Sequence, residues 1–212
     1  MKFFEDIKSH AGAISSSMYV AVQLLANVLS TKIALLPILN WPIDGGTIIY
    51  PLAFTLRDFV HKTMGKSGAR QIIVLAALTN VVMVLLFMVV GKMQPDPTWP
   101  NQGAYDAILM PVFRITLASI VAQVVSEFVD TEIFSFIYRS KRWSDVLASL
   151  GSNLVALVVD SVVFSFIAFA GSMPIEVVGQ IIVTNILIKL VMSIFASPTI
   201  ALVPRQVEFD KI

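Results

Sequence analysis

One stretch of this sequence restricts the fold more than any other. Residues 72–90, "IIVLAALTNVVMVLLFMVV", contain no charged side chain. A helix of this length rises about 1.5 Å per residue and therefore crosses about 30 Å of hydrocarbon. The composition agrees, because 57% of the 212 residues are hydrophobic and only 14% are charged, against roughly 25% charged in an ordinary soluble domain. The sequence therefore predicts an integral membrane protein.

Five other apolar segments have about the length that a membrane span requires. With residues 72–90 they predict an all-α integral membrane protein, a single transmembrane domain over residues 1–212 in which six transmembrane helices form a compact bundle. The expected helices cover residues 14–38, 43–60, 72–90, 108–137, 146–170 and 177–202. We expect Pro51 to kink the second of these at mid-span, because proline removes a helical hydrogen bond.

Basic residues in the expected loops give the orientation. With the N-terminus inside, nearly all loop lysines and arginines lie on one side of the membrane, and only Lys92 lies on the other. Lysine and arginine concentrate on the cytoplasmic side, so we expect a multi-pass protein with both termini in the cytoplasm. Arg57 and Arg114 lie close enough to helix ends to extend toward water.

Acidic and amide side chains recur along two of the expected helices. The segment "SIVAQVVSEFVDTEIFSFI" at residues 119–137 matches "SLGSNLVALVVDSVVFSFI" at residues 149–167. At about 100° per residue, polar and aromatic side chains gather on one face of each helix. These are Gln123, Glu127, Asp130 and Phe134 on the first helix, and Asn153, Asp160 and Phe164 on the second.

Ionisable side chains are costly in lipid, so we expect these two faces to line one cavity inside the protein. Carboxylates there need a cation or hydrogen-bond donors. The parallel N–H groups of a guanine-type base match a carboxylate, amides bind its other polar groups, and phenyl rings stack on it. A cationic amine would also fit. The alternative is that both faces are polar contacts between helices, for Gln123 and Asn153 above all.

The first and last helices supply two further candidates. Asn27 shares a polar face with Gln23, Ser30 and Thr31. Lys189 lies near the middle of the last helix, one turn from Asn185. It is therefore a better candidate than Lys32 of the first helix for neutralising a buried carboxylate.

Several kinds of site are not predicted. The chain has no cysteine and no "HExxH", "GxSxG" or "GxxxxGK" motif, and His10 and His61 are isolated. We therefore expect no enzymatic activity, catalytic residue, metal or cofactor, and any ATP-driven mechanism would need another chain. We expect membrane lipid and a small nucleobase-like molecule as partners, and no nucleic acid.

Five motifs occur in a particular order: "NVLSTKI", "IIYPLAFTLRDFVHKTMGKSGARQ", "FRITLASIVAQVVSEFVDTEIFSF", "GSNLVALVVDSVVFSFIAFAG" and "IKLVMSIFASP". Their succession resembles the queuosine precursor transporter family, also called vitamin-uptake-like transporters, over nearly the whole chain. The matching positions include Asp58, Asp130, Asp160 and Lys189, and through them Asp58 joins the candidate ligand-binding residues.

The resemblance implies import of a 7-deazaguanine-type base such as preQ0, preQ1 or queuine, the precursors of the modified tRNA nucleoside queuosine, across a bacterial inner (plasma) membrane. It also implies a fold similar to the substrate-binding subunits of energy-coupling-factor transporters. A substrate-binding subunit for a vitamin-like ligand, dependent on a separate ATPase complex, is the alternative function. A homodimer also stays open.

Overall fold

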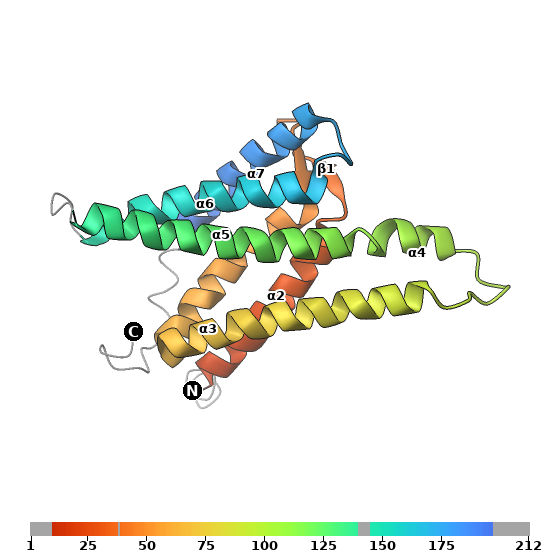
Figure 1. The fold of residues 1–212 in the computed structure, drawn as a ribbon, viewed down its shortest axis with the longest axis horizontal. Coiled ribbons are helices and arrows are strands. Elements are labelled where there is room, and N and C mark those ends of the chain that lie inside the picture. Colours follow the sequence, from red (N-terminus) through yellow and green to blue (C-terminus); the bar gives the residue numbers. More distant parts are fainter. Residues whose placement is uncertain (1–9, 38, 140–144, 197–212) are drawn as a thin grey trace. The chain divides into compact units, whose positions relative to one another are not determined.

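The structure is a computed structural model that describes residues 10–37, 39–139 and 145–196. Figure 1 shows a mostly helical chain with one short two-stranded sheet. Its elements are α2 (Ala11–Leu29), β1 (Ile33–Leu35), β2 (Pro42–Asp44), the 3-10 helix η1 (Gly45–Ile48), α3 (Tyr50–Gly91), α4 (Gln102–Leu109), α5 (Val112–Arg139), α6 (Asp145–Phe169) and α7 (Ile175–Ala196).

Membrane-spanning potential is concentrated in four helical segments of the described residues. They are Ala11–Leu29, Ser67–Gly91, Gln102–Ser126 and Ile175–Met192, each long and apolar enough to cross a bilayer. Leu154–Phe169 is a shorter apolar helix. A helical, multi-pass membrane protein is therefore supported, whereas the count of six spans stays a prediction.

The first helix ends earlier than the sequence predicts. α2 stops at Leu29, and the remainder of the expected helix 14–38 forms a turn and strand β1, which pairs with β2. The backbone N–H of Leu36 donates to the carbonyl oxygen of Trp41 at 3.0 Å across this hairpin. Pro37 has no N–H and favours an extended residue before it, so the segment suits a strand better than a helix.

The second helix begins later than predicted. β2 and η1 occupy the start of the expected helix 43–60, and α3 begins at Tyr50. Pro51 therefore lies in the first turn of α3, where its missing N–H costs no hydrogen bond. The predicted mid-span kink at Pro51 is wrong. The break comes instead at Gly65, whose φ of 75° favours glycine.

The later helices follow the sequence more closely. α6 and α7 begin near residues 146 and 177, as expected. The expected helix 108–137 is divided, because α4 ends at Leu109 and α5 begins at Val112. Pro111 lies between them and has no N–H with which to continue a helical hydrogen-bond pattern.

The chain divides into two compact units. Unit 1 comprises Met1–Ile33, Asp44–Val112 and Ile188–Ile212, and unit 2 comprises Ala34–Ile43 and Phe113–Leu187. The single transmembrane domain over residues 1–212 stays a prediction, and each unit is described by itself below.

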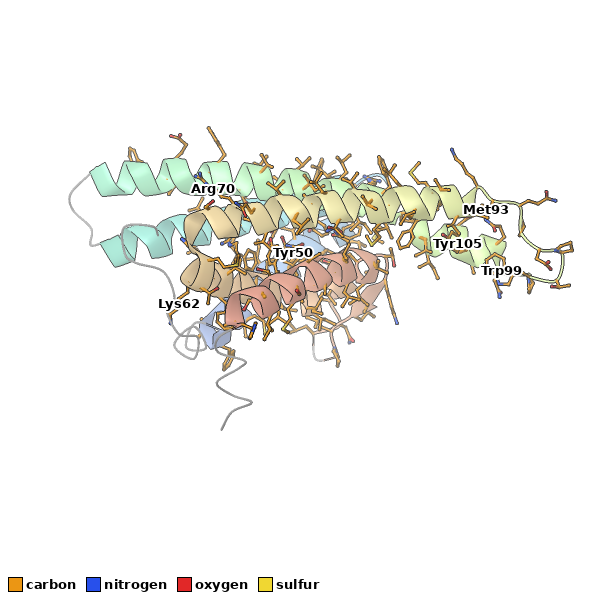
Figure 2. All side chains as sticks on the ribbon, turned by 90° about the horizontal axis from the view of Figure 1, so that it is seen from below. Tyr50, Lys62, Arg70, Met93, Trp99 and Tyr105 are labelled. Atoms are coloured by element: carbon orange, nitrogen blue, oxygen red, sulfur yellow. The ribbon has the colours of Figure 1, made fainter. Side chains whose placement is uncertain are left out.

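Unit 1 is built on α2 and α3. Its core consists of Tyr19, Val22, Ala53, Leu56, Val60, Ile72 and Ala76. Gly12 lets the two helices approach closely, because a Cβ there would lie 2.9 Å from Met64 Cγ. At the other end of α3, Gln102 Nε2 of α4 donates to the carbonyl oxygen of Gly91 at 3.0 Å. Figure 2 shows Lys62 near the turn of α3 and Trp99 at the far end.

Unit 2 contains α5, α6 and the first part of α7. α5 and α6 run side by side (Figure 1), and Arg114 of α5 donates through Nε to the carbonyl oxygen of Ile167 of α6 at 2.6 Å. Asn185 Nδ2 of α7 donates to Ser165 Oγ of α6 at 3.3 Å. The buried side chains of this unit are mostly small or polar: Thr116, Ala118, Ser119, Ala122, Ser126, Asp160, Ser161, Ser165, Ala168, Thr184 and Asn185. Ile115, Phe169, Val178 and Ile181 are buried there as well, so the interior of unit 2 combines polar and apolar side chains.

Candidate functional site

The duplicated polar faces lie on α5 and α6, both in unit 2. Gln123 is half-buried, and Ser126 beside it donates through Oγ to the Gln123 carbonyl oxygen at 3.1 Å. Four predicted site residues have side chains outside the described part of the structure: Glu127, Asp130, Phe134 and Asn153. That the two faces share one cavity therefore stays a prediction.

Of the carboxylates on the two duplicated faces, Asp160 is the one whose side chain the structure describes. Its side chain is only 5% exposed, on an α6 that carries apolar residues on most of its surface. Phe164, one turn further along, packs edge-to-face against Phe169 with ring centroids 5.9 Å apart. A buried carboxylate is costly unless its charge is compensated, and an acid in such a helix is by default a functional residue.

Asn27 lies in unit 1, in a contact between helices. Its Nδ2 donates to Asn80 Oδ1 of α3 at 2.7 Å, and Asn80 Nδ2 donates to the Ala76 carbonyl oxygen at 2.9 Å. Both asparagines are buried. This is the bond pattern that holds membrane helices together, and ligand binding by Asn27 stays a prediction.

Lys189 is 3% exposed and also belongs to unit 1. Its Nζ lies 4.9 Å from the centre of the Tyr50 ring, a cation–π distance. Tyr50 in turn meets Phe54 edge-to-face at 5.4 Å, and the guanidinium of Arg57 lies 5.7 Å from the centre of the Phe54 ring. The buried ammonium of Lys189 on α7 therefore lies over the first of a series of aromatic rings at the start of α3. The predicted site residue Asp58 follows Arg57 there, and its side chain is exposed.

One buried acid that sequence reasoning missed is Asp44, which is 1% exposed. Ser30 Oγ donates to its Oδ1 at 2.7 Å, Thr47 Oγ1 donates to its Oδ2 at 2.7 Å, and the Thr47 N–H donates to Oδ1 at 3.1 Å. Asp44 thereby caps η1. The signal was available, because aspartate three residues before a threonine in "DGGT" is a helix-capping pattern.

Arg114 has a role that the sequence did not indicate. Its side chain is half-buried, and its guanidinium donates to the carbonyl oxygens of Ile167 and Ala170 and to Ser172 Oγ. The last carbonyls of a helix have no helical partner, so Arg114 satisfies the end of α6. Helix periodicity carries no signal for these bonds, because the partners are 53 to 58 residues away in the sequence.

No group of three or more histidine, aspartate or glutamate side chains suited to a metal ion occurs among the residues that the structure describes. Among the described residues, the candidate site therefore comprises the buried carboxylate of Asp160 in unit 2 and the buried Lys189 above a tyrosine ring in unit 1. Groups of these kinds are able to bind and orient a polar molecule.

Comparison with known proteins adds a family. A family model described as "Putative vitamin uptake transporter" matches residues 44–203. The "Probable queuosine precursor transporter" of Bacillus subtilis (strain 168) is 26% identical over 156 residues, which cover 72% of this chain and 68% of that protein. No solved structure matches significantly.

Proposed function

Because this chain belongs to the vitamin uptake transporter family, we propose that it imports a queuosine precursor, a 7-deazaguanine-type base, across the bacterial plasma membrane. The name of the Bacillus relative supports this cargo. The structural observation that carries the proposal is the burial of Asp160 on an otherwise apolar helix. The adjacent N–H donors of such a base match the two oxygens of a carboxylate.

In this proposal, α5 and α6 bind the base within unit 2. Asp160 accepts hydrogen bonds from the N–H edge, and Phe164 offers an aromatic surface next to it. Gln123, Glu127, Asp130, Phe134 and Asn153 complete the site as the duplicated pattern predicts. Asp58, Asn27 and Lys189 are assigned to binding on the family resemblance and the sequence pattern.

The charges of unit 1 support the proposed orientation. Lys62 and Arg70 lie at the end of α3 where the chain turns, whereas Met93 and Trp99 lie at the opposite end (Figure 2). Basic residues concentrate on the cytoplasmic side, and tryptophan is common at membrane interfaces. We therefore assign the turn at Gly65 to the cytoplasm, which places both termini there in a six-span topology.

Uptake of labelled precursor by vesicles that contain only this chain tests the function. We expect saturable uptake of preQ0, preQ1 or queuine by the wild-type protein and its loss in Asp160→Asn. Asp96→Asn is the matched control, because it makes the same chemical change in an exposed loop. Equal uptake by Asp160→Asn and the wild type would remove Asp160 from the site, and absence of precursor uptake would exclude the stand-alone importer.

One observation favours a second candidate, a binding subunit that works with a separate ATPase complex. Ala13, Ser17 and Ala21 recur every four residues on α2, and all three side chains are exposed. Small residues in such a row admit a close helix partner in a membrane. Uptake without added ATPase subunits would exclude this alternative, whereas precursor binding without uptake would favour it.

A further inference from the structure

Two hydroxyl groups in unit 2 make no hydrogen bond in the part of the chain that the structure describes. They are Thr116 Oγ1 on α5 and Ser161 Oγ on α6, whose side chains are 3% and 0% exposed. Buried polar groups in proteins nearly always have a partner, so each exception requires an explanation, such as a bound water or ion.

Other helical hydroxyls of this chain show how these two differ. Thr63, Thr79 and Thr184 each donate to the carbonyl oxygen four residues earlier, at 2.7–2.8 Å. Thr116 and Ser161 also lie within helices, at positions where this bond is sterically available. Their hydroxyls make no such bond. Both oxygens are therefore left for a partner in the interior of unit 2.

The contacts between helices place these hydroxyls within about one helical turn of each other in depth. Arg114 reaches the Ile167 carbonyl oxygen, and α5 and α6 are antiparallel, so Thr116 lies about level with Ser165. Asn185 Nδ2 donates to Ser165 Oγ, which brings α7 to the same level. Ser161 lies one turn, about 6 Å, further along α6, directly after the buried Asp160.

The cluster formed by Asp160, Ser161 and Thr116, with Ser165 and Asn185 nearby, contains only oxygen ligands of two kinds. It offers one carboxylate and several neutral oxygens from hydroxyl and amide groups, without sulfur or imidazole. Oxygen ligands suit hard cations, and calcium sites combine several carboxylates. Ala118, Ser119 and Ala122, further along α5, are small and buried, so this part of α5 presents no bulky side chain to the cluster.

We propose that unit 2 binds Na⁺ between α5, α6 and α7, with Asp160 as the charged ligand and the Thr116 and Ser161 hydroxyl oxygens as neutral ligands. Its role as the coupling ion rests on the proposed import function, since carriers place coupling ions beside the cargo near the middle of the membrane. Its binding does not depend on cargo, and the test therefore contains none.

The test is thermal unfolding of the purified full-length chain in detergent, titrated with NaCl at constant ionic strength against N-methylglucamine chloride. A cation that binds only the folded state raises Tm in a saturable way, from which an apparent Kd follows. We expect Na⁺ to raise Tm, and Asp160→Asn to abolish the rise. Ser161→Ala and Thr116→Val should each raise the apparent Kd for Na⁺ at least about tenfold.

Thr184→Val is the matched control, because Thr184 is equally buried in unit 2 but donates to its own helix. Its apparent Kd for Na⁺ should equal that of the wild type.

Equal Tm values in Na⁺ and N-methylglucamine would overturn the proposal and leave a bound water as the partner of the two hydroxyls. Equal weakening by Thr184→Val would overturn it too. If Ser161→Ala does not fold, the apparent Kd of Thr116→Val for Na⁺ tests the proposal instead. Vesicles that take up no precursor reject the import function and leave this Tm result standing.

Discussion

The buried polar groups of the two units are used differently. In unit 1, Asn27 binds Asn80, and Ser30 and Thr47 bind Asp44, so these side chains satisfy one another. In unit 2, the hydroxyls of Thr116 and Ser161 have no partner among the described residues. Buried polar groups that bond to one another stabilise a fold, whereas a buried polar group without a partner is costly until a bound ion, water or ligand supplies one. Burial of polar groups alone therefore does not identify a site.

The largest expected effect distinguishes Asp44, the buried acid of unit 1, from Asp160, the buried acid of unit 2. Asp44→Asn should lower the free energy of unfolding by about 3 kcal/mol, because an amide nitrogen cannot accept the hydrogen bonds of Ser30 and Thr47. Asp160→Asn makes the same change in unit 2 and should abolish uptake. Denaturant unfolding in detergent, with uptake measured in parallel, checks both. An unchanged free energy of unfolding in Asp44→Asn, or wild-type uptake by Asp160→Asn, would contradict the comparison.

The next effect concerns the bonds that join α5 to the end of α6. Arg114→Lys should cost about 2 kcal/mol, because a lysine ammonium cannot reproduce the planar set of donors that reaches two carbonyls and Ser172. Arg70→Lys, on an exposed position of α3, is the control and should leave Tm unchanged. A similar fall in Tm for both variants would remove the capping role of Arg114.

These contacts explain what the sequence can and cannot predict. The uninterrupted apolar run at residues 72–90 predicts the spanning segment Ser67–Gly91 well, because a span depends on length and composition. The hairpin and η1 escape prediction, because the Ser30–Asp44 bond joins residues distant in sequence. Gly46 there packs so closely that a Cβ would lie 2.4 Å from the Ala26 carbonyl oxygen. Helix periodicity carries no information on such a contact.

The candidate site, like the fold, could be predicted only in part from the sequence. Periodicity predicts which residues share a face, and the burial of Asp160 agrees with that pattern. It does not distinguish a binding face from an interhelical contact, and Asn27 shows how readily the two coincide. The unpaired hydroxyls of Thr116 and Ser161 had no sequence signal, because serine and threonine in a helix ordinarily bond to their own backbone.

A smaller effect is expected for the contact between Asn27 and Asn80. Asn27→Ala, Asn80→Ala and the double variant form a cycle whose coupling energy should be about 1 kcal/mol, as for other polar contacts between membrane helices. Unfolding in detergent measures it. Uptake by Asn27→Ala should stay near the wild-type level if the side chain only joins α2 to α3. A loss of uptake without a loss of stability would instead make Asn27 a ligand-binding residue.

The smallest effect lies outside the spans, in the loop before α4. Hydrogen bonds from the Thr98 hydroxyl and backbone N–H hold the pKa of Asp96 below its ordinary value. A depressed folded-state pKa means that the contribution of Asp96 to stability is present above the unfolded pKa and is lost as the pH falls through the folded one. Thr98→Val removes the hydroxyl and should raise the pKa of Asp96, measured by NMR titration, with little change in Tm because the carboxylate is exposed to solvent. An unchanged pKa would show that the backbone N–H alone sets the titration of this loop, and a large fall in Tm would show that the loop contributes to unit 1 far more than its exposure implies.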